Sequence, residues 1–205
     1  MWDVPQHPVP APELIGLISP GAQRPLSVGS TSGVVELAAF PSAQQIVAVP
    51  VDEVMGAVAR TRGIVTLHPR LDDIEASSPT DGFDTILFHH TLHHFADPAR
   101  VLRQLRRVAA PRCDIVVAVP NASYHALRRI ARRPYAGPVP IRSFARDGIH
   151  APGIRFLRAV GQEAGLAWRF HWPRPEAVKG AGRLLPSGVE RWIAPQIFAV
   201  GRYRP

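Results

Sequence analysis

The sequence predicts an α/β domain with a mostly parallel sheet, and three observations carry this prediction. The segment from Phe83 to Asn121 reads as a strand, a short polar turn, an amphipathic helix and a second strand. The second strand, Ile115 to Val119, is a continuous apolar run, which is typical of a parallel strand covered on both faces. At 205 residues and 46% hydrophobic content, the chain can bury the core that such a sheet needs. A strand, a crossover helix and a second strand together form a βαβ unit.

Each element of this unit has a local cause. Thr85 to Phe88 is a β-rich apolar run, and Pro98 suits the first turn of a helix, where its missing N–H costs nothing. The helix then shows a buried stripe at three- and four-residue spacing, made of Val101, Leu102, Leu105 and Val108. Its solvent-facing side carries Arg100, Arg103, Arg106 and Arg107. We expect the Pro111-Arg112 pair to end the helix.

The first half of the chain predicts three more strands. Glu13 to Ile18 reads as a short helix stopped by Ser19-Pro20-Gly21, and Pro25 to Val28 as the first strand. The sequence VGSTSG, from Val28 to Gly33, is a glycine- and serine-rich turn. The second strand is predicted at Ile46 to Val49, and a weak third strand begins at Val65-Thr66.

The C-terminal part predicts a long connection, a helix and two strands. The connection from Ala131 to Gly153 is rich in Pro and Gly, and connections of this length are usually functional. The other elements are a helix from Ile154 to Ala164 ending at Gly165, a strand from Ala167 to Trp172, an irregular crossover from Pro173 to Val189 and a strand from Gln196 to Gly201. No repeat or second domain is visible, so we expect a cap segment at residues 1–24 and one domain at 25–205.

The charge of +8 raises the question of an anionic partner. Lys179 is the only lysine among 24 basic residues, and the arginines are spread over several segments. No aromatic residues of the kind that stack on bases accompany the arginine clusters, which argues against nucleic-acid binding. A solvated basic face is the simpler interpretation.

The remaining composition predicts a cytoplasmic protein. No apolar run approaches the roughly 20 residues that span a bilayer. The N-terminus has no basic segment followed by an apolar one, so no export signal is predicted. Cys113 has no partner for an internal disulfide and reads as a small buried thiol.

The Phe83–Asn121 unit resembles the second half of the class I S-adenosylmethionine-dependent methyltransferases. The match rests on Phe83-Asp84, Leu92-His93-His94 and Asp97-Pro98, then on Leu102, Leu105, Val108 and Pro111, and on the exit Val119-Pro120-Asn121. The resemblance implies a Rossmann-like methyltransferase fold, with a central, mostly parallel seven-stranded sheet and helices on both faces. It also implies S-adenosylmethionine as the cofactor.

The same resemblance assigns the cofactor site. The residues implied are Ser27, Gly29, Ser30, Thr31 and Gly33 at the first turn, Pro50, Val51 and Asp52 after the second strand, Asp72 and Asp73 after the third, and His89 after the fourth. Three positions depart from the family pattern. Thr31 replaces its middle glycine, Ser27 replaces an acid, and Pro50 replaces the carboxylate that accepts from the ribose hydroxyls. Asp52 or Glu53 can substitute for that carboxylate, or can serve only as negative charge at a helix N-terminus.

The histidine cluster from His89 to His94 allows more than one role. His89, His93 and His94 are candidates to deprotonate a methyl acceptor, because imidazole ordinarily titrates near neutral pH. A metal site is conceivable, but no carboxylate or thiolate ligand accompanies the cluster, so no metal is predicted. Packing and surface roles remain alternatives for each histidine.

The resemblance places the acceptor beneath the 131–153 connection. The candidate substrate residues are Tyr135, Arg142, Phe144, Arg146 and His150. The arginines there predict an acceptor with negative charge, since guanidinium groups bind carboxylate or phosphate in a bidentate way. We expect methyl transfer to an oxygen or nitrogen of a small molecule. The alternative is a catalytically inactive methyltransferase-like partner or scaffold protein, and the sequence does not predict an oligomeric state.

Overall fold

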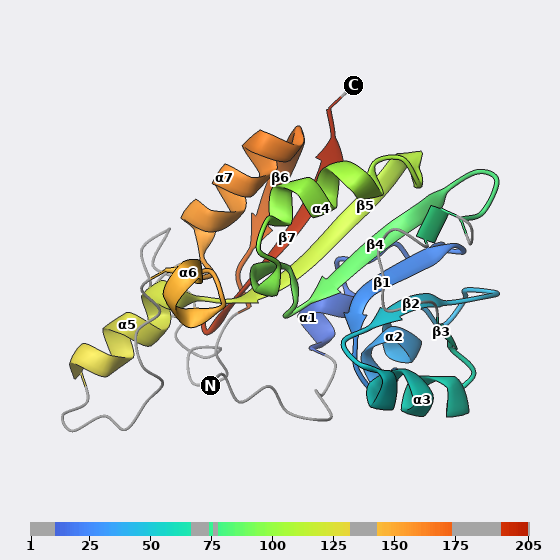
Figure 1. The fold of residues 1–205 in the computed structure, drawn as a ribbon, viewed down its shortest axis with the longest axis horizontal. Coiled ribbons are helices and arrows are strands. Elements are labelled where there is room, and N and C mark those ends of the chain that lie inside the picture. The colour runs from blue at the N-terminus through green and yellow to red at the C-terminus, as the bar shows by residue number, and fades with distance from the viewer. Residues whose placement is uncertain (1–10, 67–73, 76–77, 132–142, 174–193, 205) are drawn as a thin grey trace.

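The computed structural model describes residues 11–66, 74–75, 78–131, 143–173 and 194–204. Within these residues, the chain forms one seven-stranded sheet in the order β3-β2-β1-β4-β5-β7-β6 (Figure 1). The strands are β1 Pro25–Ser30, β2 Val47–Pro50, β3 Val65–Thr66, β4 Phe83–His89, β5 Ala109–Pro120, β6 Leu166–His171 and β7 Gln196–Tyr203. The strands β1 to β5 pair in parallel, and β7 runs antiparallel to both of its neighbours.

Helices cover both faces of the sheet. They are α1 Pro12–Ile15, α2 Val34–Ala39, α3 Glu53–Thr61, the 3-10 helix η2 Leu92–His94, α4 Pro98–Leu105, α5 Ala122–Ala131, α6 Phe144–Asp147 and α7 Ile154–Ala164. The helices α4 and α7 pack on one face, and α1, α2 and α3 pack on the other. This arrangement confirms the Rossmann-like fold class expected from the sequence. None of the described helices is long and apolar enough to cross a membrane.

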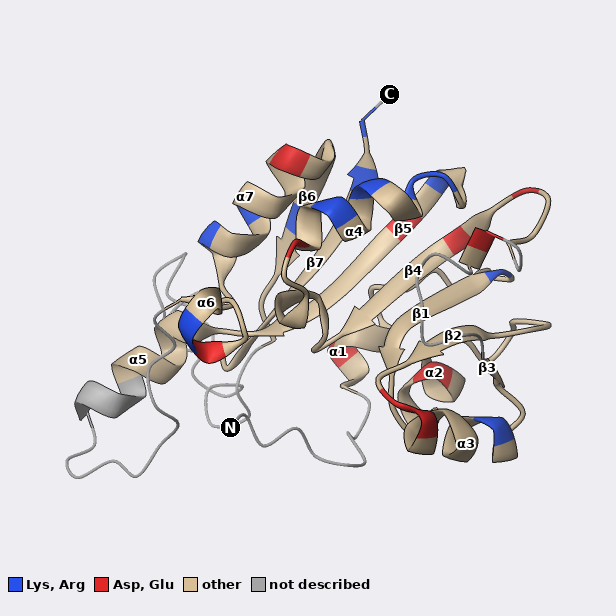
Figure 2. Cartoon of the chain, in the orientation of Figure 1, with Lys and Arg blue, Asp and Glu red and all other residues tan. Residues whose placement is uncertain are grey.

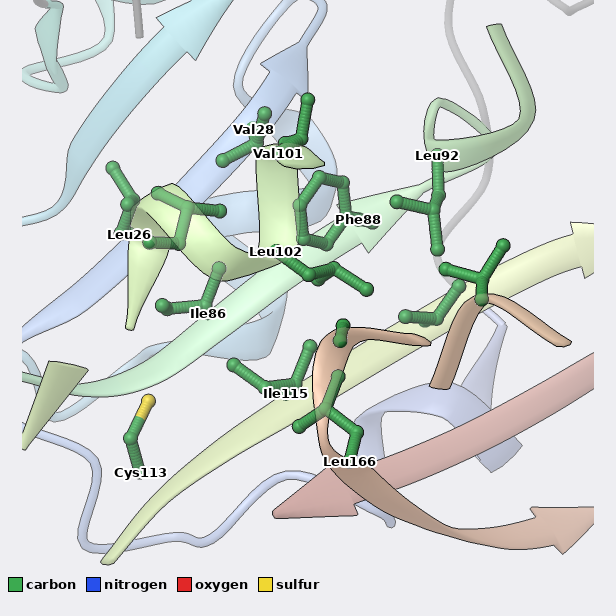
Figure 3. Close-up of a cluster of buried hydrophobic side chains, with 14 of the residues drawn as sticks. Leu26, Val28, Ile86, Phe88, Leu92, Val101, Leu102, Cys113, Ile115 and Leu166 are labelled. Atoms are coloured by element: carbon green, nitrogen blue, oxygen red, sulfur yellow. The ribbon is translucent and has the colours of Figure 1, made fainter. Parts of the chain in front are cut away.

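Alternation along the central strands divides the core into two layers. On β4, Ile86 and Phe88 face α4, whereas Leu87 lies in the layer on the opposite face of the sheet. Figure 3 shows part of the first layer, where Ile86, Phe88 and Ile115 of the sheet surround Leu102 of α4. Because both faces are buried, these strands are continuously apolar and their register is strongly specified.

The sequence misplaced the start of β5. Helix α4 ends at Leu105, and β5 begins at Ala109, so Pro111 and Arg112 lie inside a strand. The pairing with β4 shifts between Phe83 opposite Ala109 and Thr85 opposite Asp114. Pro111 is exposed in this irregular part, where its missing N–H breaks no ladder bond.

The other predicted elements differ mainly at their ends. Helix α7 has the predicted bounds, because its apolar period and its C-cap at Gly165 are both local signals. Helix α1 begins and ends earlier than expected, and β1, β4 and β7 are longer than their apolar runs. Helix α5 directly precedes the connection expected at 131–153, and α6 lies within it; sequence periodicity revealed neither helix. Most of the crossover expected at 173–189 lies outside the described residues.

Candidate functional site

The candidate site lies at the carboxyl ends of the parallel strands, where loops after β1, β2 and β4 meet. The turn after β1 has two glycines with left-handed backbone, Gly29 at φ 79° and Gly33 at φ 85°. Gly33 is the N-cap residue of α2. A side chain at either position would strain the backbone, which explains why glycine stands at both ends of the turn.

Gly29 is also constrained by the loop that follows β4. A Cβ at Gly29 would lie 2.3 Å from Thr91 Cγ2. The Thr91 hydroxyl donates a hydrogen bond to the Val28 carbonyl at 2.7 Å. Glycine at position 29 leaves room for the Thr91 side chain. The two loops are therefore closely packed at this point.

Two hydroxyl groups in the turn are buried without partners. Ser30 is 2% exposed and Ser32 is fully buried, and neither Oγ atom has a hydrogen-bond partner among the described residues. The backbone carbonyl of Ser32 does have a partner, because it accepts a hydrogen bond from Arg62 Nη1. Buried hydroxyls usually find a partner, so these two mark a place where a polar ligand group fits. Thr31, between them, is partly exposed.

Ser27 lies below the turn and faces a carboxyl group that the sequence analysis missed. The Ser27 hydroxyl donates to Glu36 Oε1 at 2.8 Å, and Glu36 is only 2% exposed. Burial raises the pKa of Glu36, and the hydrogen bond from Ser27 opposes that rise. Helix α2 thus brings a carboxyl group to the position where the family has an acid on the strand. Its other oxygen, Oε2, is buried with no partner among the described residues.

The turn after β2 is tied to the turn after β1. Ser30 is paired with Pro50, and the Val51 N–H donates to the Ser30 carbonyl at 2.9 Å. Asp52 is exposed and is the N-cap of α3, with Oδ1 accepting from the Met55 N–H at 2.8 Å. The capping role is therefore observed, and it leaves Oδ2 of Asp52 available to a ligand. Glu53 is exposed and begins α3.

The histidines after β4 form a compact group. The rings of His89 and His90 are 4.5 Å apart, and those of His93 and His94 are 4.2 Å apart. His90 has φ 60°, a left-handed backbone conformation that is uncommon for residues other than glycine. His93 is 1% exposed, and its Nδ1 has no partner among the described residues. The fold therefore brings the three predicted candidates, His89, His93 and His94, to one place.

Burial keeps these imidazoles neutral. It lowers the pKa of His89 to about 3 and that of His93 to about 3, with neighbouring histidines adding to the effect. The pKa of His90 falls to about 4, although a hydrogen bond with Gln196 opposes the fall. Burial also lowers the pKa of His94, the exposed member of the group. At neutral pH all four rings are therefore uncharged, and each has one ring nitrogen that can accept a hydrogen bond.

The segment containing α6 packs against this group. The His150 N–H donates to the His93 carbonyl at 2.9 Å, and His150 Nε2 lies 3.2 Å from the Ala96 carbonyl oxygen. The Phe144 ring stacks on the His150 ring at 4.7 Å. Two predicted substrate residues, Phe144 and His150, are thus joined to the predicted catalytic histidines. Arg146 is exposed on α6.

Other predicted site residues cannot be placed. Asp72, Asp73, Tyr135 and Arg142 lie outside the described residues. Among the residues that are described, no group of three or more potential ligands is arranged to hold a metal ion.

The sequence analysis did not single out Asn121 as a residue that organises this end of the sheet. Its side-chain Nδ2 donates to the Ala194 carbonyl at 2.8 Å, and its N–H donates to the Pro195 carbonyl at 2.9 Å. Asn121 therefore fixes the entry into β7 beside the end of β5. An asparagine directly after a buried strand was the available signal, but its partner is 73 residues away along the chain.

Comparison with known proteins agrees with this geometry. A family model described as a methyltransferase domain matches residues 11–169. The structure is similar to an S-adenosylmethionine-dependent methyltransferase from Mesorhizobium loti, with 18% identity, coverage of 93% of this chain and 96% of that chain, and a TM-score of 0.65. It is also similar to the mitomycin 7-O-methyltransferase MmcR, with 19% identity, coverage of 93% and 52%, and a TM-score of 0.58.

A third similar structure contains a bound ligand. The magnesium protoporphyrin IX methyltransferase from Synechocystis PCC 6803, with bound SAH, shares 9% identity, with coverage of 89% of this chain and 75% of that chain and a TM-score of 0.57. Identities this low show a shared fold. No curated protein matches the sequence.

Proposed function

Because the chain belongs to the methyltransferase domain family, whose cofactor is S-adenosylmethionine, we propose that it methylates an oxygen or nitrogen of a small molecule. The observation that carries the proposal is the turn from Gly29 to Gly33, with its buried, unpartnered Ser30 and Ser32 hydroxyls. This turn lies at the carboxyl end of β1, and ligands of open α/β sheets bind outside the carboxyl ends of the strands. We also propose one catalytic domain at residues 25–205 behind a cap segment, and a cytoplasmic location.

The residues present fit the cofactor at two of its polar parts. The Ser30 and Ser32 hydroxyls can donate to a carboxylate or accept from an ammonium group. Asp52 Oδ2 has no partner in the described part of the chain and can accept from a ribose hydroxyl, because only Oδ1 is used in capping. When bound, S-adenosylmethionine supplies a methyl group on a positively charged sulfur. Such chemistry needs positioning and exclusion of water more than it needs a nucleophile on the protein.

The histidine group would act on the acceptor. A hydroxyl or amine acceptor loses a proton on methylation, and a neutral imidazole can take it. Burial lowers the pKa of His89 and His93 to about 3, which makes them weak bases and better suited to orienting an acceptor through hydrogen bonds. His94 is exposed, so its ring can pass the proton to solvent. We therefore assign proton removal to His94 among the three candidates.

The α6 segment would cover the acceptor. The stacked rings of Phe144 and His150 offer a flat apolar surface next to His93. Arg146 supplies positive charge on the same short helix, which supports the proposal of an anionic acceptor. Replacing Arg146 with Ala should lower turnover and leave cofactor affinity unchanged.

The alternative function, a catalytically inactive partner, rests on a specific observation. Pro50 offers the ribose no side-chain acceptor, and one carboxylate oxygen of Asp52 is already used to cap α3. If Oδ2 of Asp52 makes no ribose contact, the loss of charge-assisted hydrogen bonds weakens cofactor binding by about 1.5–3 kcal/mol.

Calorimetric titration with S-adenosylmethionine and with its demethylated product tests the proposal. We expect dissociation constants between about 1 μM and 1 mM, the range of ordinary substrate constants. Replacing Ser30 or Ser32 with Val should weaken binding, because the unpaired hydroxyls would be lost. Ser143→Ala is the control, because Ser143 is an exposed serine at the N-cap of α6, outside the turn after β1. No heat at millimolar ligand, with a normal melting temperature, would reject the enzyme in favour of the inactive partner.

A further inference from the structure

A second candidate binding site lies at the edge of the sheet, in a groove between α7 and the edge strand β6. The groove has a volume of about 540 Å³. It is lined by Arg158, Gln162, Leu166, Ala167, Trp168, Phe170 and Arg204. Because Leu166 begins β6 and Arg204 follows the end of antiparallel β7, the groove lies toward the amino ends of the parallel strands. The candidate cofactor site is at their carboxyl ends.

The indole of Trp168 is fixed in the wall of this groove by two glycines. A Cβ at Gly161 would lie 2.0 Å from Trp168 Nε1, and a Cβ at Gly201 would lie 2.5 Å from Trp168 Cζ3. Gly161 is inside α7, and Gly201 is inside β7, positions where glycine is destabilising by roughly 0.5–1 kcal/mol relative to alanine. Both glycines therefore make space for one aromatic ring. The result is a rigid apolar wall.

Two guanidinium groups add positive charge to this wall. Arg158 Cζ lies 5.7 Å from the centroid of the Phe170 ring, and both Arg158 and Arg204 are exposed. Neither arginine pairs with a carboxylate in the described part of the chain. The acid of α7, Glu163, is bonded to Arg103 at 2.9 Å instead. Figure 2 shows this basic character along α4 and α7.

The backbone around Arg204 holds that residue at the end of the groove. The Arg204 N–H donates to the Gly165 carbonyl at 2.9 Å, and its carbonyl accepts from Arg106 Nη2 at 3.1 Å. The backbone of Arg204 is thus anchored beside Gly165, next to Leu166, whereas the Arg158 guanidinium lies over the Phe170 ring farther along β6. A ligand in the groove would meet a cation near each end and apolar rings between them.

We propose that this groove binds a small amphipathic anion, a carboxylate, sulfonate or phosphate with an aromatic or aliphatic body. The volume favours a small molecule, because ligand pockets usually measure about 300–1,000 Å³. The unpaired arginines favour negative charge, since a guanidinium makes its strongest hydrogen bonds to anionic oxygens. The Trp168 and Phe170 rings favour an apolar body. The proposal is independent of the methyltransferase activity.

A pair of fluorescent probes tests the proposal on the full chain. Anilinonaphthalene sulfonate has an aromatic body with one sulfonate, and N-phenylnaphthylamine has the same rings without the charge. We expect the sulfonate to bind saturably to the wild-type protein and more tightly than the neutral probe. Arg158→Ala and Arg204→Ala should each weaken sulfonate binding roughly three- to tenfold, as for loss of one partly exposed charged contact.

Arg169→Ala is the matched control. Arg169 is exposed on β6, the strand beside the groove, but does not line it, so this variant removes one guanidinium charge near the groove without changing its lining. We expect it to leave sulfonate affinity unchanged, and all three variants to keep the wild-type melting temperature. The proposal is overturned if Arg169→Ala weakens binding as much as the groove variants do. It is also overturned if the double variant of Arg158 and Arg204 binds like wild type, or if the neutral probe binds equally well.

Discussion

The Thr91 side chain occupies the space in which a Cβ atom on Gly29 would lie, 2.3 Å from Thr91 Cγ2. The same side chain holds the end of β1 through its hydrogen bond to the Val28 carbonyl. Gly29→Ala should therefore destabilise the protein twice, through the left-handed backbone and through the contact with Thr91. We expect a loss of about 2–4 kcal/mol in the free energy of unfolding, measured by urea denaturation.

A double-mutant cycle separates these two causes. Thr91→Ala alone should cost about 1 kcal/mol for the lost hydrogen bond. In the double variant, Gly29→Ala with Thr91→Ala, the smaller side chain at position 91 relieves part of the clash with the new Cβ atom. The loss in the free energy of unfolding should therefore be smaller than the sum of the two single losses by at least about 0.5 kcal/mol. Strict additivity would show that backbone strain, and not Thr91, selects glycine at this position.

Stability should fall in acid because of the buried histidines. Their folded pKa values of about 3 for His89, about 4 for His90 and about 3 for His93 lie below the ordinary 6.5, so protons bind to the unfolded chain first. Above pH 7, both states are neutral and the three groups contribute no pH dependence. As the pH falls from about 6.5 to 4, each should lower stability by up to about 1.4 kcal/mol per pH unit.

Urea midpoints at a series of pH values measure this slope, and His93→Gln should make it shallower. Glu36 acts with the opposite sign, because its raised pKa means that the folded state takes up a proton first as the pH falls. Glu36 is a single group, whereas three histidines act in the other direction, so the histidines should determine the net pH dependence of stability. Glu36→Gln removes the opposing contribution and should steepen the fall. A flat profile from pH 7 to 5 in that variant would contradict the neutral, buried state of the histidines.

Asp52 can be tested for its two roles separately. Asp52→Ala should destabilise α3 by about 1 kcal/mol, since the cap to the Met55 N–H is lost, whereas Asn keeps capping ability. If Oδ2 contacts the ribose, Asp52→Asn should leave stability nearly unchanged but weaken binding of S-adenosylhomocysteine about tenfold or more. Calorimetry and thermal melting on the same samples distinguish the roles. Glu53→Ala tests the alternative acceptor: a loss of affinity in this variant and not in Asp52→Asn would assign the ribose contact to Glu53.

Gly161→Ala should destabilise the protein although alanine is the better helix former. The helix gains about 1 kcal/mol in intrinsic propensity, but the new methyl group would lie 2.0 Å from Trp168 Nε1. Displacing the indole should give a net loss of about 1–3 kcal/mol. Nothing lies within 4 Å of a Cβ atom built at Gly153, so Gly153→Ala should lower the free energy of unfolding by less than about 1 kcal/mol. Equal effects at the two glycines would argue against the fixed position of Trp168.

The sequence by itself determined the elements whose signals are local. Helix α7 was predicted with its observed bounds, because its apolar period and the left-handed Gly165 lie within one short segment. The Phe83–Asn121 unit was also predicted, because a strand buried on both faces and a helix with one apolar stripe have different periods. The glycine-rich turn was identified as a site candidate through the family resemblance, and the histidine cluster because imidazole ordinarily titrates near neutral pH.

Only the tertiary structure decided which side chains meet. Ser27 faces Glu36 because α2 folds back over β1, and Thr91 reaches Val28 across 63 residues of sequence. The low pKa values of the histidines follow from burial, which depends on every element packed around them. Trp168 lies between Gly161 and Gly201 because α7 packs on β6 and Gly201 of β7 is the cross-strand partner of Trp168. Some of these contacts join segments far apart in the chain, and others, such as Ser27–Glu36, join neighbouring elements. No local period or motif encodes either kind, because both form only when the helices pack on the sheet.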